Sequence, residues 1–598
     1  MKAFQGFRDT LKVSKAVVKL IWETSHKYTV YVVILLTLNA FVPVLEAYFI
    51  KKIIDNLSLS FQTHIAFGII LNYIIFFIIV TLFSRLVENQ RNSTQIVLGN
   101  LFSKQINNKI VEKTTKLAFW RFEDPKFHDK LDRTRDQATW KPLNTFYHLF
   151  DSLQSVFMLL SIFVVLYSLS PFLVLLMVLF AIPSLVTQIK YGNIWWNLLY
   201  QETPDSRRLS YYQHLMTSIN EMKDIKLLNL RSYLLSKYGI LYEKLFNEQK
   251  AVVIKRYIWE FVSYLISDII LVLFYIYLAW QTYLRSLSIG DFTFYSTIYA
   301  RGVFALHSLV KDIAGIYENN LFINELLEFL SMEEEKTIKG SKDIKNISKG
   351  FEFRNVWFKY PGTSNWILKG ISFKLPLKES IALVGENGAG KTTIVKLLTR
   401  LYMPDNGEIL LDGKNIEKFE INKYRQLFGV AFQDFARFHF SVEDNIRFGD
   451  VNNKISINKI IQMAKKTQIH KKIMTLPLKY KTTLGRWFHE GHEISYGEWQ
   501  RVAIARALIR DSHVYILDEP TAALDAKAEY TVFREFKKHV KGKTALFISH
   551  RFSNVRLADE ILVLENGKII QKGNHEELIK QTGRYKQLYN FQAKRYKE

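Results

Sequence analysis

The sequence has no cysteine, no cleavable signal segment and no long Lys/Arg-rich block. The absence of cysteine from the 598 residues excludes disulfide bonds, thiolate metal sites and a cysteine nucleophile. Residues 1–25 are too polar for a secretory signal, and no small-residue cleavage site follows them. Without a dense basic block, the net charge of +25 gives weak support for nucleic-acid binding, and basic loops of a membrane protein explain it better.

Apolar residues make up 48% of the chain and are concentrated in its first half, whereas the second half has the composition of a soluble α/β protein. A helix needs roughly 20 apolar residues to cross the hydrocarbon core of a membrane. Lys and Arg lie mostly between and after the apolar runs, as the positive-inside bias predicts. The sequence therefore predicts six membrane-spanning helices, the last of them weaker: Tyr28–Ile50, Ile65–Phe83, Leu153–Leu169, Phe172–Val186, Val262–Trp280 and Phe292–Val310.

The segments between the apolar runs alternate between short and long. Ser170-Pro171 breaks the third run from the fourth and predicts a tight helical hairpin. The long, charged intervals after the second and fourth runs predict helices that continue into the cytoplasm, with both chain termini on that side. Within these intervals, Phe119–Phe127 and Asn220–Leu227 form either short transverse helices at loop tips or ordinary solvated turns.

Two further features of the first half leave alternatives open. In residues 1–25, Val13, Val17, Leu20 and Ile21 recur at helical spacing, and this helix lies either along the inner membrane surface or against protein. Ionisable side chains inside apolar runs are costly, so they face either a cavity for cargo, an interface or an intramolecular partner. These side chains are Glu46, Asp268, Arg301 and His307.

A glycine-rich turn in the second half connects a strand pattern, Ser380–Val384, to an apolar helix pattern. Glycines let backbone N–H groups curl around phosphates, and the helix N-terminus adds the positive end of its dipole. Lys391 supplies a cation for the β- and γ-phosphates, and the Thr392 hydroxyl a ligand for Mg²⁺. The turn matches the phosphate-binding loop GxxxxGK[ST] and consists of Gly385, Glu386, Asn387, Gly388, Ala389, Gly390, Lys391, Thr392 and Thr393.

Two carboxylates end a second buried-strand pattern, which begins at Val514. Asp518 suits the coordination sphere of Mg²⁺, directly or through water. Glu519 suits a base that orients or deprotonates an attacking water. An acidic strand end without a special role is the alternative, and the phosphate-binding loop upstream favours the catalytic interpretation.

These motifs, in this order, resemble the nucleotide-binding domain of ABC transporters. The resemblance implies that Tyr360 in FKYPG stacks on adenine and that Gln433 in VAFQD contacts Mg²⁺ and the water. ISYGE stands where the family has its LSGGQ signature, and Ser495 and Gly497 keep the groups expected to meet the γ-phosphate, which predicts a competent signature. The resemblance also implies a D-loop aspartate and a histidine that contacts the γ-phosphate, Asp525 and His550.

The resemblance covers nearly the whole chain and implies an all-α membrane domain of six helices fused to an α/β P-loop NTPase domain, in the cytoplasmic membrane. Trp120–Asp129 and Met222–Leu230 fall where exporters of this family have coupling helices. In this family the signature of one subunit closes over the P-loop of the other, so the resemblance implies a dimer. A homodimer is the simplest assembly and a heterodimer the alternative. The expected parts are an N-terminal elbow helix, a transmembrane domain, a linker and the nucleotide-binding domain, at 1–25, 26–325, 326–350 and 351–598.

The implied activity is ATP-driven export by alternating access, with ATP and Mg²⁺ as cofactors. Three short stretches are similar to bacterial lantibiotic exporters and favour a peptide or another amphipathic cargo: Glu221–Asn229, Phe432–Phe435 and Gly485–His492. A flippase for lipids or lipid-linked glycans, or a multidrug exporter, is the alternative within the same class. A soluble ABC ATPase acting on nucleic acid is a different class, and the six apolar runs count against it.

Overall fold

A computed structural model describes the chain except residues 1, 62–65, 125, 126, 128, 129, 132, 133, 135–139, 220, 336–343, 345, 346, 520–525, 550 and 595–598. The chain forms two compact units. The helical unit comprises residues 1–116 and 129–332, and the nucleotide-binding unit comprises residues 117–128 and 333–598. The expected start of the linker at residue 326 lies inside a helix that ends at Ser331.

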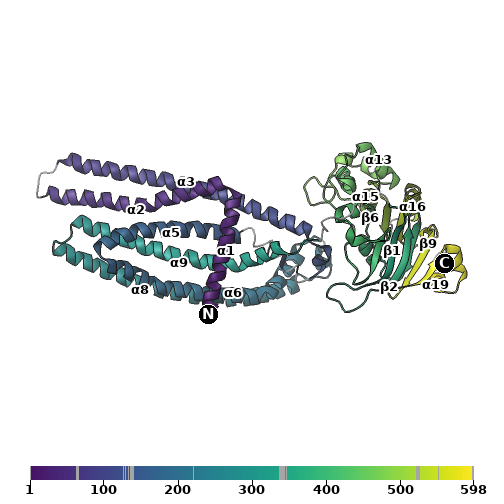
Figure 1. The fold of residues 1–598 in the computed structure, drawn as a ribbon, viewed down its shortest axis with the longest axis horizontal. Coiled ribbons are helices and arrows are strands. Elements are labelled where there is room, and N and C mark those ends of the chain that lie inside the picture. The colour runs from purple at the N-terminus through teal and green to yellow at the C-terminus, as the bar shows by residue number, and fades with distance from the viewer. Residues whose placement is uncertain are drawn as a thin grey trace. The chain divides into compact units, whose positions relative to one another are not determined.

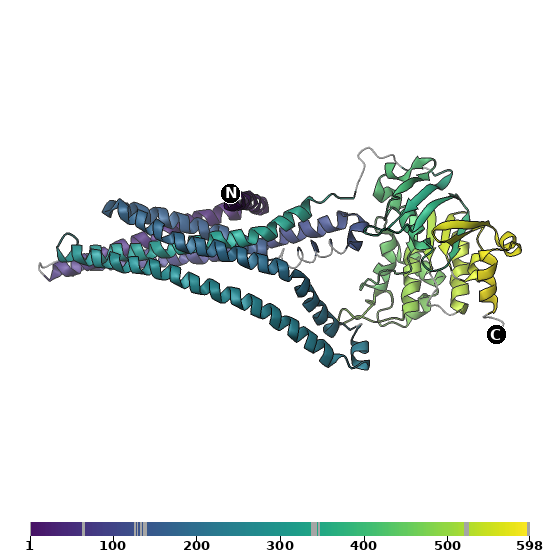
Figure 2. The ribbon, with the colours of Figure 1, turned by 90° about the horizontal axis from the view of Figure 1, so that it is seen from below.

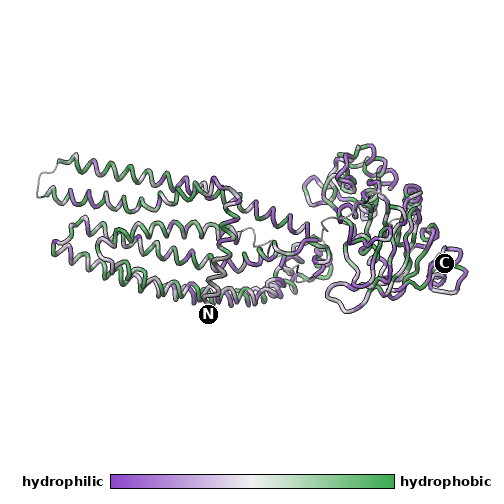
Figure 3. The backbone as a smooth tube through the Cα atoms, in the orientation of Figure 1, coloured by the Kyte–Doolittle hydropathy of each residue, from purple (hydrophilic) through white to green (hydrophobic). Residues whose placement is uncertain are grey.

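The helical unit is a bundle of long helices that lie side by side along their apolar parts (Figure 1). Figure 2 shows that two of them, α6 and α8, run together and diverge from α3 and α9 along their polar extensions. Figure 3 shows apolar residues concentrated along one part of the bundle and hydrophilic residues along these extensions. The described helices are α1 (Lys2–Thr24), α2 (His26–Ser60), α3 (Phe67–Lys116), α5 (Lys141–Leu169), α6 (Pro171–Thr217), α7 (Met222–Leu227), α8 (Arg231–Tyr283) and α9 (Ile289–Ser331).

Each predicted span lies in a different long helix, which confirms the six-helix architecture, although residue 65 is outside the described residues. Five helices, α2, α3, α5, α6 and α8, are long and apolar enough to cross a membrane. Helix α9, which holds the weaker sixth run, does not meet the same criterion. The exposed fractions of Ile79 and Leu82 on α3 are 55% and 61%, and such surface is stable where lipid covers it.

The helix ends follow the sequence signals. Helix α5 ends at Leu169 and α6 begins at Pro171, so the predicted break is confirmed; proline fits the first turn of a helix because its missing N–H has no intrahelical partner there. Helices α3 and α6 continue well past their apolar runs, as expected. Short helices also form at both predicted loop tips: Phe119–Glu123 (η1) and Met222–Leu227 (α7).

Side-chain contacts resolve several alternatives in the helical unit. Val13, Val17 and Ile21 on α1 are buried, so this face packs against protein. Arg301 donates to the Glu46 carboxylate at 3.1 Å, so these two ionisable groups are an intramolecular pair that joins α9 to α2. The His307 ring lies 4.6 Å from the Tyr264 ring on α8.

The nucleotide-binding unit contains the two described sheets. One is antiparallel, with strand order β2-β1-β4-β5, and the other has six strands in the order β10-β9-β3-β8-β7-β6. In the second sheet, β9, β3, β8, β7 and β6 are parallel and β10 is an antiparallel edge. The strands are β1 (Gly350–Phe358), β2 (Leu368–Pro376), β3 (Ser380–Gly385), β4 (Asn406–Leu411), β5 (Lys414–Asn415), β6 (Phe428–Ala431), β7 (Val514–Asp518), β8 (Thr544–Ile548), β9 (Glu560–Glu565) and β10 (Lys568–Gly573).

Helices α13, α15 and α16 cover one face of the six-stranded sheet, and α10 with the antiparallel sheet covers the other, which completes the predicted α/β fold. Strands β7 and β8 are buried at every position, as expected for parallel strands covered on both faces. Because the strands are parallel, the segments that follow β3, β6, β7 and β8 meet at one edge of the sheet, where ligands bind in open α/β folds. The longer helices are α10 (Lys391–Leu398), α13 (Ile457–Lys466), α15 (Tyr496–Leu508), α16 (Ala526–His539) and α19 (Arg584–Lys594).

The remaining helices of this unit are short. They include α11 (Ile421–Arg425), α12 (Val442–Arg447), α14 (His470–Met474), α17 (Phe552–Val555) and α18 (His575–Lys580), and the 3-10 turns η2 (Ile416–Lys418), η3 (Phe448–Asp450) and η4 (Lys479–Lys481).

Candidate functional site

The glycine-rich turn leads from β3 into α10 in the predicted order. Gly388 and Gly390 have φ angles of +81° and +101°, a region that residues with a Cβ rarely adopt, and Gly390 caps α10. The Lys391 ammonium donates to the carbonyl oxygens of Gly385 and Glu386 at 2.8 and 2.9 Å. The lysine thus spans the turn, and the Ala389 N–H donates within it to the Glu386 carbonyl at 3.2 Å. The geometry suits the binding of an anion by the other N–H groups of the turn.

A cavity of about 490 Å³ opens on this turn. The Tyr360 hydroxyl lies 3.0 Å from that of Thr393, and the Gln433 side-chain amide donates to the Glu519 carboxylate at 3.1 Å. Residues far apart in the sequence and predicted to share one site are thus brought together. The cavity is lined by Tyr360, Ile367, Asn387, Gly388, Gly390, Lys391, Thr392, Thr393, Gln433 and Glu519.

Asp518 ends β7 without any exposed surface, and neither carboxylate oxygen has a hydrogen bond within the described part of the chain. Burial and the neighbouring Glu519 raise the pKa of Asp518 to about 6, against the opposing influence of Thr392 and Lys391. Burial also lowers the pKa of Lys391, which the two carboxylates oppose. A buried carboxylate with free oxygens, beside a hydroxyl, fits a bound Mg²⁺ that takes its other ligands from phosphate and water.

Glu519 adopts a left-handed backbone conformation, with φ +47°. Its N–H donates to the Ile548 carbonyl on β8 at 3.1 Å, and its own carbonyl accepts from the Gln500 side chain at 3.3 Å. Such a conformation costs a non-glycine residue on the order of 1 kcal/mol or more and persists where the surroundings hold it. Gln500 is thus a positioning residue for Glu519, a role that its place after the signature did not reveal.

The signature segment begins α15. Ser495 caps the helix: its hydroxyl accepts from the Glu498 N–H at 3.3 Å, and its own N–H donates to the Glu498 carboxylate at 2.8 Å. The substituted Tyr496 has a role as well, because its hydroxyl donates to the Gln433 carbonyl at 3.4 Å and its ring lies 5.4 Å from that of Phe435. The departures from LSGGQ therefore form a capping box and a contact with the glutamine loop.

Ser495 is exposed and Gly497 half-buried, and neither lines the cavity at Lys391. Within one chain, the structure does not bring the predicted signature and the phosphate-binding loop together. The two remaining predicted positions, Asp525 and His550, lie outside the described residues.

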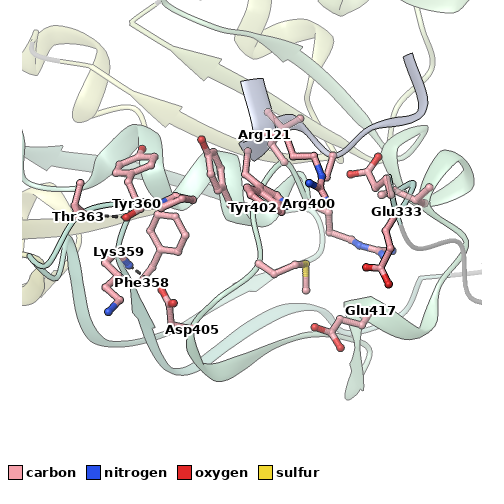
Figure 4. A pocket seen from close by; sticks show the side chains of 18 of the residues that line it. Arg121, Glu333, Phe358, Lys359, Tyr360, Thr363, Arg400, Tyr402, Asp405 and Glu417 are labelled. Carbon is pink, nitrogen blue, oxygen red and sulfur yellow. Dashed lines mark hydrogen bonds between the residues drawn. The ribbon is translucent and has the colours of Figure 1, made fainter. Parts of the chain in front are cut away.

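The loop-tip segment η1 belongs to the nucleotide-binding unit. Its Glu123 accepts from the Lys396 ammonium at 3.1 Å and from the Tyr402 hydroxyl. The same ammonium lies 5.2 Å from the centre of the Tyr360 ring. Figure 4 shows Tyr360, Tyr402 and Arg121 along an adjoining cavity of about 750 Å³. Lys396 therefore connects the loop tip, through Glu123, to Tyr360, the residue predicted to stack on adenine.

A polar cavity of about 450 Å³ in the helical unit escaped the sequence analysis. It lies among α3, α5 and α9 around the ends of their apolar runs, and His148 Nδ1 is 2.9 Å from an Asp312 carboxylate oxygen. Arg91 and Asp151 also line it. Charged side chains near the ends of three apolar runs were the signal that could have revealed it. The four ionisable residues that the sequence analysis singled out inside the runs do not line this cavity.

Residues 368–522 match the family described as ABC transporter. The subtilin transport ATP-binding protein SpaT of Bacillus subtilis is 31% identical over 92% of this chain and 89% of its own length. The nisin transport ATP-binding protein NisT of Lactococcus lactis subsp. lactis is 28% identical over 98% of this chain and 96% of its own. The structure of a bacterial Atm1-family ABC exporter with ATP bound shares the fold, with a TM-score of 0.85 and 23% identity over 95% of this chain and 98% of that one.

The identity to SpaT extends over a share of the chain too large to come from the nucleotide-binding unit alone. The exporter fold likewise covers both units. The chain therefore belongs to the ABC transporter family and joins a membrane-spanning helical part to an ATP-binding domain.

Proposed function

We propose that this chain is one half of a homodimeric exporter that uses ATP to move a peptide out of the cytoplasm. The observation that carries this proposal is the cavity at Lys391, which is lined by the residues for phosphate binding and water activation. The signature residues of the same chain do not line it, so a second chain would have to supply them. The two relatives that match over nearly the whole chain are transport proteins for subtilin and nisin, which supports a peptide as the cargo.

Each residue of the cavity has a distinct task in hydrolysis. Lys391 holds the β- and γ-phosphates, and Tyr360 stacks on the adenine. Glu519, oriented by the Gln433 amide and by its own fixed backbone, accepts a proton from the water that attacks the γ-phosphate. Asp525 and His550 complete the site by resemblance, as the D-loop residue and the γ-phosphate contact.

Mg²⁺ would be held by Thr392 and Gln433 with Asp518, and would supply neutralisation of phosphate charge. The unpartnered carboxylate of Asp518 supports this assignment. The same carboxylate is costly in the empty site, because burial disfavours its charged form more than Thr392 and Lys391 favour it.

The exposed Ser495 supports a composite site formed by two copies. A helix N-terminus that begins with a hydroxyl presents polar groups to an anion, and among the described residues the Ser495 side chain has only its capping contact. We infer that it closes over the γ-phosphate held by Lys391 of the partner. Two-fold symmetry then gives two identical sites, each complete.

Cargo would pass along the helical unit, whose polar cavity around His148 and Asp312 is the candidate contact for polar groups. ATP binding at two composite sites favours the closed state of the dimer, and hydrolysis releases it. A lipid or lipid-linked glycan is the alternative cargo.

Transport in reconstituted inside-out vesicles tests the proposal. One arm follows ATP-dependent uptake of a labelled amphipathic peptide, and a second follows flipping of a labelled phospholipid. Peptide uptake that is lost in Glu519→Gln supports the proposal, because the variant keeps the side-chain shape. Lipid flipping without peptide uptake would establish the alternative, and movement of neither under ATP turnover would contradict export of either cargo.

A further inference from the structure

A second cavity in the nucleotide-binding unit lies at the opposite edge of the six-stranded sheet. It measures about 590 Å³ and is formed by the end of α16, by α17 and by the segments that precede β3 and β8. The phosphate-binding loop follows the carboxyl end of β3, whereas Ser380 at its amino end lines this cavity. The two cavities share no lining residue, so this one is separate from the nucleotide site.

The lining of this cavity is strongly basic. Seven of its side chains are cationic and one, Asp559, is acidic, and Asp559 already accepts hydrogen bonds from Ser380. Glu535 and Asp511 lie beside three of the cations. Across the described ranges of the chain, the other four have no ion pair: Lys378, Lys537, Lys541 and Arg556. Unpaired like charges around one cavity repel each other, and a bound anion would relieve that repulsion.

Apolar groups form the floor between these cations. Phe533 and Val540 are buried, Leu557 is half-buried, and the Tyr530 ring is 60% exposed at the rim. An inorganic anion would leave this apolar surface unused. A nucleic-acid strand needs cations spaced along a groove, whereas these surround a single cavity of the size that holds small ligands or a few side chains.

We propose that this cavity binds an acidic segment of a second polypeptide. Carboxylates of the segment would meet Lys541 and Arg556 at the rim, and an apolar side chain would enter beside Tyr530. Clusters of basic side chains recognise acidic peptide motifs in this way, with charge giving orientation and the apolar contact giving specificity. The proposal concerns a surface apart from the ATP cavity and holds whatever the cargo is.

Binding of a labelled acidic peptide to the full-length protein in detergent tests this proposal. The probe is a fluorescein-labelled peptide in which glutamates alternate with leucine and serine, followed by anisotropy at low and moderate salt. Saturable binding at one site per chain is expected. Lys541→Glu with Arg556→Glu should weaken it by about tenfold or more, because two attractions become repulsions.

A matched charge reversal at exposed lysines elsewhere in the unit, Lys414→Glu with Lys454→Glu, controls for total charge and should change affinity less than about twofold. Tyr530→Ala should weaken binding several-fold without changing its salt dependence. Retained binding of a fluorescent ATP analogue shows that each variant is folded.

Several results would overturn the proposal. Equal losses in the cavity and control variants would show that binding follows net charge alone. Competition by tripolyphosphate or by a short oligonucleotide, as strong as by unlabelled peptide, would assign the cavity to another anion. A peptide with glutamine in place of glutamate that binds equally well would remove the role of charge, and absence of saturable binding would reject the site.

Discussion

Lys391 is 6% exposed, and its ammonium donates hydrogen bonds to two backbone carbonyls. Ser495, in contrast, precedes α15 as an exposed residue. Both segments are helix N-termini that suit an anion, and both belong to one domain. The first has a cavity, a cation and a base around it, whereas the Ser495 side chain at the second has only its capping contact among the described residues. The difference supports the proposal that each chain supplies one nearly complete face of an ATP site and one separate contact for another chain.

The predictions that follow test this division between the buried face and the exposed face. The buried face should control chemistry and metal binding within a chain. The exposed face should matter only for closure between chains.

Glu519→Gln should have the largest effect, because it removes the base of the buried face. Loss of a general base lowers turnover by about 100-fold or more. The side-chain oxygen of the introduced glutamine can still accept from the Gln433 amide, so ATP should still bind. Steady-state ATPase and ATP binding measure the two quantities. Glu490→Gln, at an exposed position, is the control. Turnover within twofold of the unmodified protein would disprove this role for Glu519.

Ser495→Asn separates the two roles of the exposed face. Asparagine is as good an N-cap as serine, so the helix and the thermal stability should be preserved. The lost hydroxyl contact with a charged phosphate should lower turnover by about 10- to 100-fold, since such a hydrogen bond is worth about 1.5–3 kcal/mol. ATP affinity of the separated chain should not change. An unaltered turnover number would mean that the hydroxyl never meets the nucleotide.

Asp518→Asn should stabilise the empty protein at neutral pH. The raised pKa of about 6 means that the folded state binds a proton more tightly than the unfolded state, so stability is lost as pH rises from about 4 to 6. The variant escapes this loss, which amounts to about 3 kcal/mol. Its unfolding midpoint should exceed that of the native protein at pH 7.5 and match it at pH 4. A constant difference across this range would contradict the shift.

Glu123→Gln should have the smallest effect, on coupling between the loop tip and the buried face. Its ion pair with Lys396 is partly exposed and worth up to about 1 kcal/mol, so cargo moved per ATP should fall about twofold to fivefold. Glu112→Gln removes a comparable exposed pair with Lys116 on α3 and should leave the ratio unchanged. Equal ratios in the two variants would show that this contact does not transmit nucleotide binding.

Much of the nucleotide-binding face could be predicted from the sequence because its chemistry depends on local spacing. The phosphate-binding loop must join a strand to a helix, and two carboxylates after a buried strand must reach the same sheet edge. The left-handed backbone at Glu519 could not be predicted, because it depends on a hydrogen bond to β8. The contact of Tyr496 with Gln433 could not be predicted either, because it joins segments distant in sequence.

In the helical unit, periodicity predicted the helices but not their mutual contacts. The pair of Arg301 with Glu46 and the cavity around His148 depend on how helices rotate against each other, which no single segment encodes. Helix α9 has too many polar groups to be recognised as a strong span, yet Ile298 and Tyr299 on it are fully buried within the bundle. Packing, rather than hydropathy alone, accounts for its place.

A mixed dimer tests most directly whether ATP is held between two copies. Two differently tagged chains are co-purified in a Glu519→Gln background, and retained ATP is counted. If Lys391→Ala is on one chain and Ser495→Arg on the other, the account predicts one retained ATP per dimer, because the intact loop faces the intact signature. With both changes on one chain, no ATP should be retained. The opposite outcome, retention only when both changes share a chain, would contradict a site formed between copies.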